Sequence, residues 1–212
     1  MQILEISIPV KEILAKARSY GASITAFLSA VLICAIHEEI PISRQKKPVT
    51  LMVPVNLRNF FPSQSMGNFF GWIEVGYTFS EKSTFRDVLD EVKKQFETEL
   101  VKEKIAEHMS GYVRLEKNPL IRAVPLEVKR YFLMLGAELG SRSITSVYSN
   151  VGVIRLPEEY RNYIERFGLF ASTDAMQLCS CSYGEELLLG LTSKIPDDSI
   201  QRNFHRILEK EQ

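Results

Sequence analysis

The chain has 212 residues, enough to bury a substantial core in one large or two small domains. Lysine plus arginine and aspartate plus glutamate number 26 each, and this zero formal net charge argues against a surface that follows nucleic-acid phosphates. Three cysteines are too few for a disulfide framework, and no apolar run approaches the ~20 residues that span a bilayer. The first residues also lack the basic start of a secretory signal. We therefore expect a cytoplasmic protein that binds neither nucleic acid nor membrane.

The first third of the chain predicts a strand followed by two helices. Residues 2–8 alternate apolar and polar side chains, which is typical of a strand. Residues 10–18 predict a short helix that stops at Gly21. Ser23 is a suitable N-cap for a second helix, which is apolar on nearly every side and ends before Pro41. A helix of that composition is expected between two layers of structure.

The middle of the chain predicts two strands around a polar loop, followed by helices. An apolar strand at residues 49–55 leads into Asn56, Arg58 and Asn59, and Asn68 opens a second strand that runs to about residue 79. Thr84 is expected to cap one long helix over residues 84–114, with one apolar stripe and one charged face. The Asn-Pro pair at residues 118–119 breaks the pattern, and a further helix is expected over residues 126–139.

The last third returns to a strand pattern. Residues 143–150 and 151–156 predict strands, whereas residues 160–170 are compatible with either a strand or a helix. Residues 176–183 and 187–195 predict a β-hairpin around Gly184 and Glu185, and Asp197 or Asp198 is expected to cap a final amphipathic helix. The sequence therefore predicts a single α/β domain over residues 1–212, with a mixed β-sheet and packed helices.

Three segments carry a resemblance to a known superfamily. They are LAKARSYGASITAFLSAVLICAI (residues 14–36), VPVNLRNFFPSQSMGNFF (residues 53–70) and TSVYSNVGVIRLP (residues 145–157). In this order and spacing they resemble the carboxy-terminal lobe of chloramphenicol-acetyltransferase-like proteins. That superfamily includes coenzyme-A-dependent alcohol acyltransferases and the condensation domains of peptide synthetases. The segments are most similar to bacterial proteins described as putative alcohol acetyltransferases.

The resemblance implies one lobe of the CoA-dependent acyltransferase fold. In that superfamily a tunnel runs between two similar lobes, and a histidine on the amino-terminal lobe takes a proton from the acceptor. The resemblance also implies an acyl thioester such as acetyl-CoA as a co-substrate and an amino-terminal lobe as the partner. It implies no tightly bound cofactor. The residues of this sequence that the resemblance places at the substrate tunnel are Asn56, Arg58, Gly67, Asn68, Ser149 and Asn150.

The catalytic signature of the superfamily, His-His-x-x-x-Asp, is absent from the sequence. We therefore assign no catalytic residue, and expect the chain to be an inactive half of an acyltransferase, either cut or natural. The alternative is a non-catalytic binding or assembly module derived from a condensation-type domain. In either case, two copies could pair as a homodimer that imitates the missing contact between lobes.

Each candidate residue also has an ordinary structural explanation. Asn56 and Arg58 are suited to holding a loop through its backbone, and Asn150 before Gly152 is typical turn chemistry. The three histidines (His37, His108 and His205) have no nucleophile or orienting carboxylate at a recognised spacing. Cys179 and Cys181 would share one face of a strand, and lacking a second pair they are expected to pack in the interior and not to bind a metal.

Overall fold

The computed structural model describes residues 2–42, 45–141, 143–171 and 176–211. Its strands are β1 (Gln2–Pro9), β2 (Val49–Asn56), β3 (Phe70–Tyr77), β4 (Ser146–Val153), β5 (Met176–Tyr183) and β6 (Glu186–Ser193). Its helices are α1 (Val10–Ser19), α2 (Ile24–Glu39), the 3-10 helix η2 (Leu57–Asn59), α3 (Phe85–Glu99), α4 (Lys102–Lys117), α5 (Pro119–Ala123), α6 (Leu126–Ser141), α7 (Glu158–Arg161) and α8 (Ser199–Lys210).

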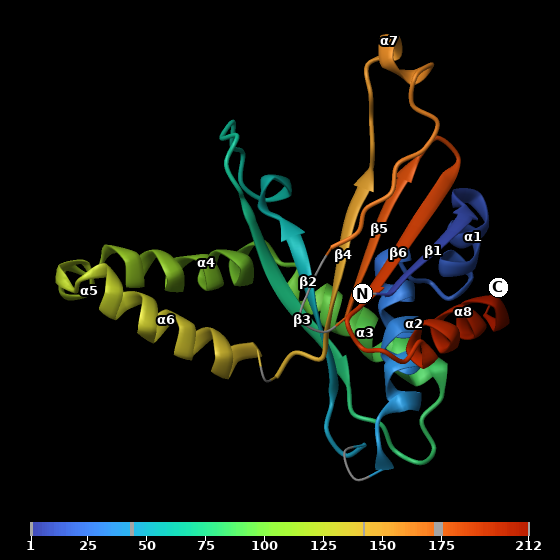
Figure 1. Ribbon diagram of the computed structural model, residues 1–212, viewed down its shortest axis with the longest axis horizontal. Coiled ribbons are helices and arrows are strands. Elements are labelled where there is room, and N and C mark those ends of the chain that lie inside the picture. The colour runs from blue at the N-terminus through green and yellow to red at the C-terminus, as the bar shows by residue number, and fades with distance from the viewer. Residues whose placement is uncertain (1, 43–44, 142, 172–175, 212) are drawn as a thin grey trace.

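The strands form one mixed six-stranded sheet in the order β1-β6-β5-β4-β2-β3 (Figure 1). The pairs β1–β6, β5–β6 and β2–β3 are antiparallel, whereas β4 runs parallel to both β2 and β5. The β5–β6 hairpin turns at Gly184, whose φ of 62° is the left-handed conformation that glycine adopts without steric cost. The structure thus confirms the predicted mixed α/β architecture.

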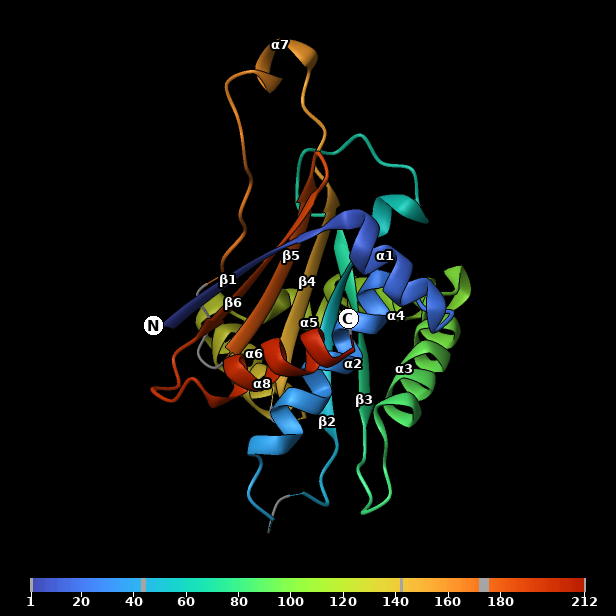
Figure 2. The same cartoon turned by 90° about the vertical axis from the view of Figure 1, so that its right-hand side faces the viewer.

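The hydrophobic core lies between the sheet and the helices α1, α2, α3 and α8, which cover one face (Figure 2). Helix α2 is buried on nearly every side, as its composition predicts, because it lies between β2 and the two helices α3 and α8. Its start is fixed by Ser23, whose Oγ accepts a hydrogen bond from the Ala26 N–H at 3.1 Å. On the opposite face, residues 167–171 lie against β5 and β6, where the Thr192 hydroxyl donates to the Ala171 carbonyl at 2.6 Å.

The predicted long helix over residues 84–114 is wrong, because two helices replace it. Thr84 and Asp87 form a capping box that starts α3, and Leu100 ends that helix with a non-helical ψ of 36°. Helices α4, α5 and α6 then form an arm that projects away from the sheet (Figure 1). Within the described residues this arm contributes nothing to the main core cluster. No single described helix is long and apolar enough to cross a membrane, although α1 and α2, bent by 80°, pass that test as a pair.

Three further boundaries differ from the sequence-based expectations. A single strand, β4, replaces the two strands expected over residues 143–156, and a bulge interrupts its pairing with β5. The ambiguous stretch 160–170 holds only the end of the short helix α7, followed by irregular chain. Before α8, Asp198 occupies the N-cap position, but it is the Asp197 carboxylate that accepts the Ser199 N–H, at 3.1 Å.

Candidate functional site

The sheet topology brings the predicted tunnel residues to one end of the molecule. Strands β2 and β4 are parallel neighbours, so their carboxyl ends meet at the same edge of the sheet. Asn56 is the last residue of β2, and Ser149 and Asn150 are the two central residues of β4. The loop between β2 and β3, which carries Arg58, Gly67 and Asn68, extends from the same end (Figure 1). These side chains come from three separate segments of the chain.

Arg58 holds the loop between β2 and β3 together. The Asn56 side-chain oxygen accepts the Arg58 N–H at 3.1 Å and so caps η2. The Arg58 guanidinium donates to the carbonyl oxygens of Ser65, at 2.6 Å, and Gly67, at 2.9 Å. Its guanidinium carbon also lies 5.8 Å from the centroid of the Phe69 ring. Two of the donors that could meet a ligand are therefore engaged in fixing the loop.

Asn150 joins the bulge of β4 to the first turn of α2. Its side-chain nitrogen donates to the Thr25 hydroxyl at 2.8 Å, and its side-chain oxygen accepts the Gly152 N–H at 2.9 Å. Gly152 has a φ of 80°, a conformation that favours glycine and makes this local turn possible. Both polar atoms of the Asn150 amide are thus engaged in fixing the end of β4 against α2.

Asn68 and Ser149 keep their polar atoms available. Asn68 is exposed and Ser149 is half-buried. No side-chain hydrogen bond joins either residue to another described residue. Of the polar side chains predicted at the tunnel, these two are therefore best placed to meet a ligand, whereas Asn56, Arg58 and Asn150 act chiefly on the backbone and on α2.

An apolar groove of about 1050 Å³ adjoins this end of the sheet. It lies between the end of β2, strand β3 and helix α4. Most of its lining is apolar, including Val55, Leu57, Phe70, Trp72 and Ile105, but His108 and three glutamates (Glu74, Glu99 and Glu107) also line it. Sequence reasoning missed it because residues 102–114 were expected to continue α3. The only signal in the sequence is the recurrence of apolar residues beyond residue 100, which a continuous helix explains equally well.

The histidines do not form a base–nucleophile pair in the described parts of the chain. The His37 ring stacks on Phe79 at 3.6 Å between centroids, and burial lowers the pKa of its imidazole. His108 lines the apolar groove, and His205 lies 3.4 Å from the Glu209 carboxylate. No hydrogen bond joins any of these rings to a described hydroxyl or thiol, as activation of a nucleophile would need.

Cys179 and Cys181 are buried, and among the described residues neither belongs to a cluster of metal-ligating side chains. Cys179 and Cys181 lie in β5 with 1% and 2% of their surfaces exposed, and burial raises the pKa of both thiols. Cys181 donates a weak hydrogen bond to the Phe167 carbonyl at 3.6 Å. Across residues 2–42, 45–141, 143–171 and 176–211, no three histidine, cysteine or acidic side chains cluster as metal ligands would.

Comparison with known proteins relates the chain to acyltransferases and condensation domains. A family model described as the C-terminus of phthiocerol/phthiodiolone dimycocerosyl transferase matches residues 9–162. Polyketide synthase associated protein 5 from Mycobacterium tuberculosis superposes with a TM-score of 0.60 at 11% identity, over 98% of this chain and 50% of that one. No protein of curated function matches the sequence.

Two further solved structures share the fold. The epimerization domain of tyrocidine synthetase B has a TM-score of 0.61 at 11% identity, over 99% of this chain and 46% of that one. A wax ester synthase/diacylglycerol acyltransferase from Marinobacter aquaeolei VT8 has a TM-score of 0.52 at 15% identity, over 99% and 49% respectively. The chain therefore spans about half the length of these proteins, and its fold is that of a carboxy-terminal lobe of the condensation and acyltransferase type.

Proposed function

Because this chain belongs to the family of phthiocerol/phthiodiolone dimycocerosyl transferase C-terminal domains, we propose that it is the carboxy-terminal lobe of a cytoplasmic, thioester-dependent acyltransferase. In this proposal the lobe forms one wall of the substrate tunnel, and an amino-terminal lobe supplies the histidine that acts as general base. The acyl donor would be acetyl-CoA or another acyl thioester, and the acceptor an alcohol or an amine.

The observation that carries the proposal is the convergence of a polar loop, a strand end and an apolar groove at one end of the sheet. The groove beside β3 offers apolar surface to an acyl chain, and the unengaged polar groups of Asn68 and Ser149 offer hydrogen bonds to a thioester or an acceptor. Arg58 and Asn150 would keep these two segments in place. Proton transfer would fall to the partner lobe, because the catalytic signature of the superfamily, His-His-x-x-x-Asp, is absent from this sequence.

A thiol-release assay tests this function. The chain would be incubated with acetyl-CoA and a panel of alcohols and amines, alone and together with an amino-terminal lobe that carries His-His-x-x-x-Asp. We expect thiol release only with both lobes, and a loss of about tenfold or more for Ser149→Ala in the two-lobed protein. Release by the chain alone, abolished by His108→Phe, would contradict the proposal by placing the base in this lobe.

A second candidate is a non-catalytic binding or assembly module, and the arm favours it. Helix α6 exposes large apolar side chains, among them Leu126, Tyr131, Phe132 and Leu133. Monomeric proteins seldom leave such patches uncovered, so another lobe or a second copy of the chain would bury them. Sedimentation of wild type and of Leu133→Lys would separate these cases. A dimer that the substitution dissociates supports pairing of copies, and a monomer at high concentration excludes it.

A further inference from the structure

The two outer strands of the sheet, β3 and β1, each lie beside a helix that carries a buried or half-buried glutamine. On the β3 side, Gln95 of α3 accepts the Gly76 N–H at 2.8 Å and donates to the Gly76 carbonyl at 3.0 Å. In an extended chain the N–H and C=O of one residue point to the same side, so one carboxamide can bond both groups. Gln95 thereby satisfies the outward-facing backbone of the outermost strand.

On the β1 side, the corresponding amide has no hydrogen-bond partner within the described part of the chain. Gln201 of α8 is only 4% exposed, and neither its side-chain nitrogen nor its side-chain oxygen has a hydrogen-bond partner among the described residues. The side-chain oxygen of Gln2, at the start of β1, is also buried and unpaired within that set. Buried amides are nearly always hydrogen-bonded, so these atoms indicate that a partner is missing.

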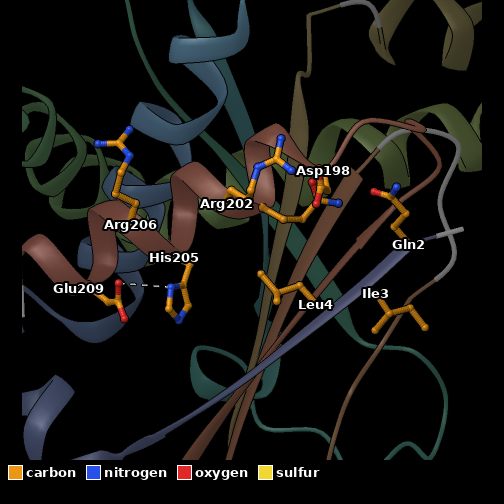
Figure 3. A pocket seen from close by; sticks show the side chains of 9 residues that line it. Gln2, Ile3, Leu4, Asp198, Arg202, His205, Arg206 and Glu209 are labelled. Atoms are coloured by element: carbon orange, nitrogen blue, oxygen red, sulfur yellow. Dashed lines mark ion pairs between the residues drawn. The ribbon is translucent and has the colours of Figure 1, made fainter.

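A groove of about 670 Å³ separates Gln201 from the outer strand. It is lined by three consecutive residues of β1 (Gln2, Ile3 and Leu4) and by one face of α8. Figure 3 shows Leu4 between β1 and α8, with Arg202 and His205 on the helix. Among the described residues only β6 pairs with β1, which leaves the second backbone edge of β1 available to another strand.

The ionisable side chains that line the groove each lie beside a side chain of opposite charge type, although the partner of Arg206, Glu38, lies outside the groove. Arg202 forms an ion pair with Asp198, Arg206 with Glu38, and His205 lies 3.4 Å from the Glu209 carboxylate. The groove therefore offers backbone groups, one buried carboxamide and the apolar side chains of β1, but no excess charge of either sign. A charged ligand would have to break these pairs, whereas an uncharged extended segment would not.

We propose that this groove binds an extended, uncharged peptide segment of another protein, which adds to β1 as a seventh strand. One edge of the segment pairs with the free edge of β1, and the opposite edge presents the N–H and C=O of one residue to Gln201, as Gly76 does to Gln95. The site is independent of the proposed acyltransferase function, because β6, β5 and β4 separate β1 from β2 and its loop.

A synthetic peptide provides the first test. The probe is an end-capped copy of residues 187–193 of β6, Leu-Leu-Leu-Gly-Leu-Thr-Ser, labelled with an uncharged fluorophore; it omits Glu186 and otherwise reproduces the strand that β1 pairs with on its inner edge. We expect saturable binding in fluorescence anisotropy. N-methylation of one set of alternate residues should weaken binding at least tenfold, and methylation of the other set much less. No saturable binding, or equal effects of the two sets, would overturn the proposal.

A matched pair of variants tests the role of the amide. Gln201→Met removes the carboxamide but keeps the volume, so it should weaken peptide binding about fivefold and leave the melting temperature unchanged or higher. Gln95→Met, the control, should lower the melting temperature because it leaves the Gly76 backbone unpaired, and should leave peptide binding intact. Unchanged peptide binding by Gln201→Met, or a loss of stability as large as that of the control, would refute the assignment.

Discussion

Replacing Asn150 with alanine separates a structural role from a ligand-binding role. The substitution removes the 2.8 Å bond to the Thr25 hydroxyl and the 2.9 Å bond from the Gly152 N–H. At roughly 0.5–1.5 kcal/mol for each hydrogen bond, the free energy of unfolding should fall by about 2 kcal/mol. For a chain of this size that corresponds to a melting temperature about 4–8 °C lower. Urea unfolding followed by circular dichroism measures the change directly.

A double-mutant cycle with Thr25→Val shows whether the lost energy belongs to this contact. Thr25→Val removes the acceptor but keeps a β-branched side chain in the first turn of α2. If the two side chains bond each other, the coupling energy should be about 1 kcal/mol. The opposite result would be a free energy of unfolding for Asn150→Ala within about 0.5 kcal/mol of the wild-type value, together with a loss of activity when a two-lobed enzyme carries the same substitution. In that case the amide contacts a ligand and our structural interpretation is refuted.

Three other predictions follow from local geometry. Arg58→Ala frees two loop carbonyls in an exposed segment, so backbone hydrogen exchange in residues 59–69 should accelerate while global stability changes by less than about 0.5 kcal/mol; unchanged exchange would contradict this. Gly190→Ala would place a Cβ 2.4 Å from the Leu169 carbonyl oxygen, so the free energy of unfolding measured in urea should fall by about 1–3 kcal/mol. A variant as stable as wild type would show instead that the backbone at Leu169 moves away at little cost. Burial raises the pKa of the Cys34 thiol to about 12, whereas in the unfolded chain it is about 8.5, so the free energy of unfolding should fall as the pH rises from the lower value to the higher one. Cys34→Ala should remove this part of the pH dependence of the unfolding free energy. An unchanged pH dependence in the variant would show that Cys34 is not its source.

The elements that could be predicted from the sequence are those whose signals are local. The cap at Ser23, the apolar helix after it and the glycine turn at Gly184 each depend on residues close together in the chain. The order of these elements along the chain also predicted the mixed sheet and the resemblance to one lobe of a two-lobed fold. Local signals suffice there because capping and turn formation are decided within a few residues.

The remaining features depend on contacts between distant residues. Nothing between Glu99 and Lys102 marks a break by glycine or proline, and α3 ends there although apolar residues continue at helical spacing. Similarly, the sequence indicates that Asn150 is a polar strand-end residue but not that its partner is Thr25, 125 positions away. Which polar groups remain available to a ligand is therefore a property of the folded structure, and the groove beside β3 escaped prediction for the same reason.

The position of β4 has a consequence for how the chain folds. β4 is flanked by parallel strands from two antiparallel units, and its links to them span long separations: Thr145 bonds Thr50 across 95 positions, and Ser146 bonds Met176 across 30. The hairpins β2–β3 and β5–β6 close much shorter loops and lose less chain entropy in doing so. We therefore expect these hairpins to form early and β4 to enter between them in a late, slower step, so that substitutions in β4 chiefly accelerate unfolding.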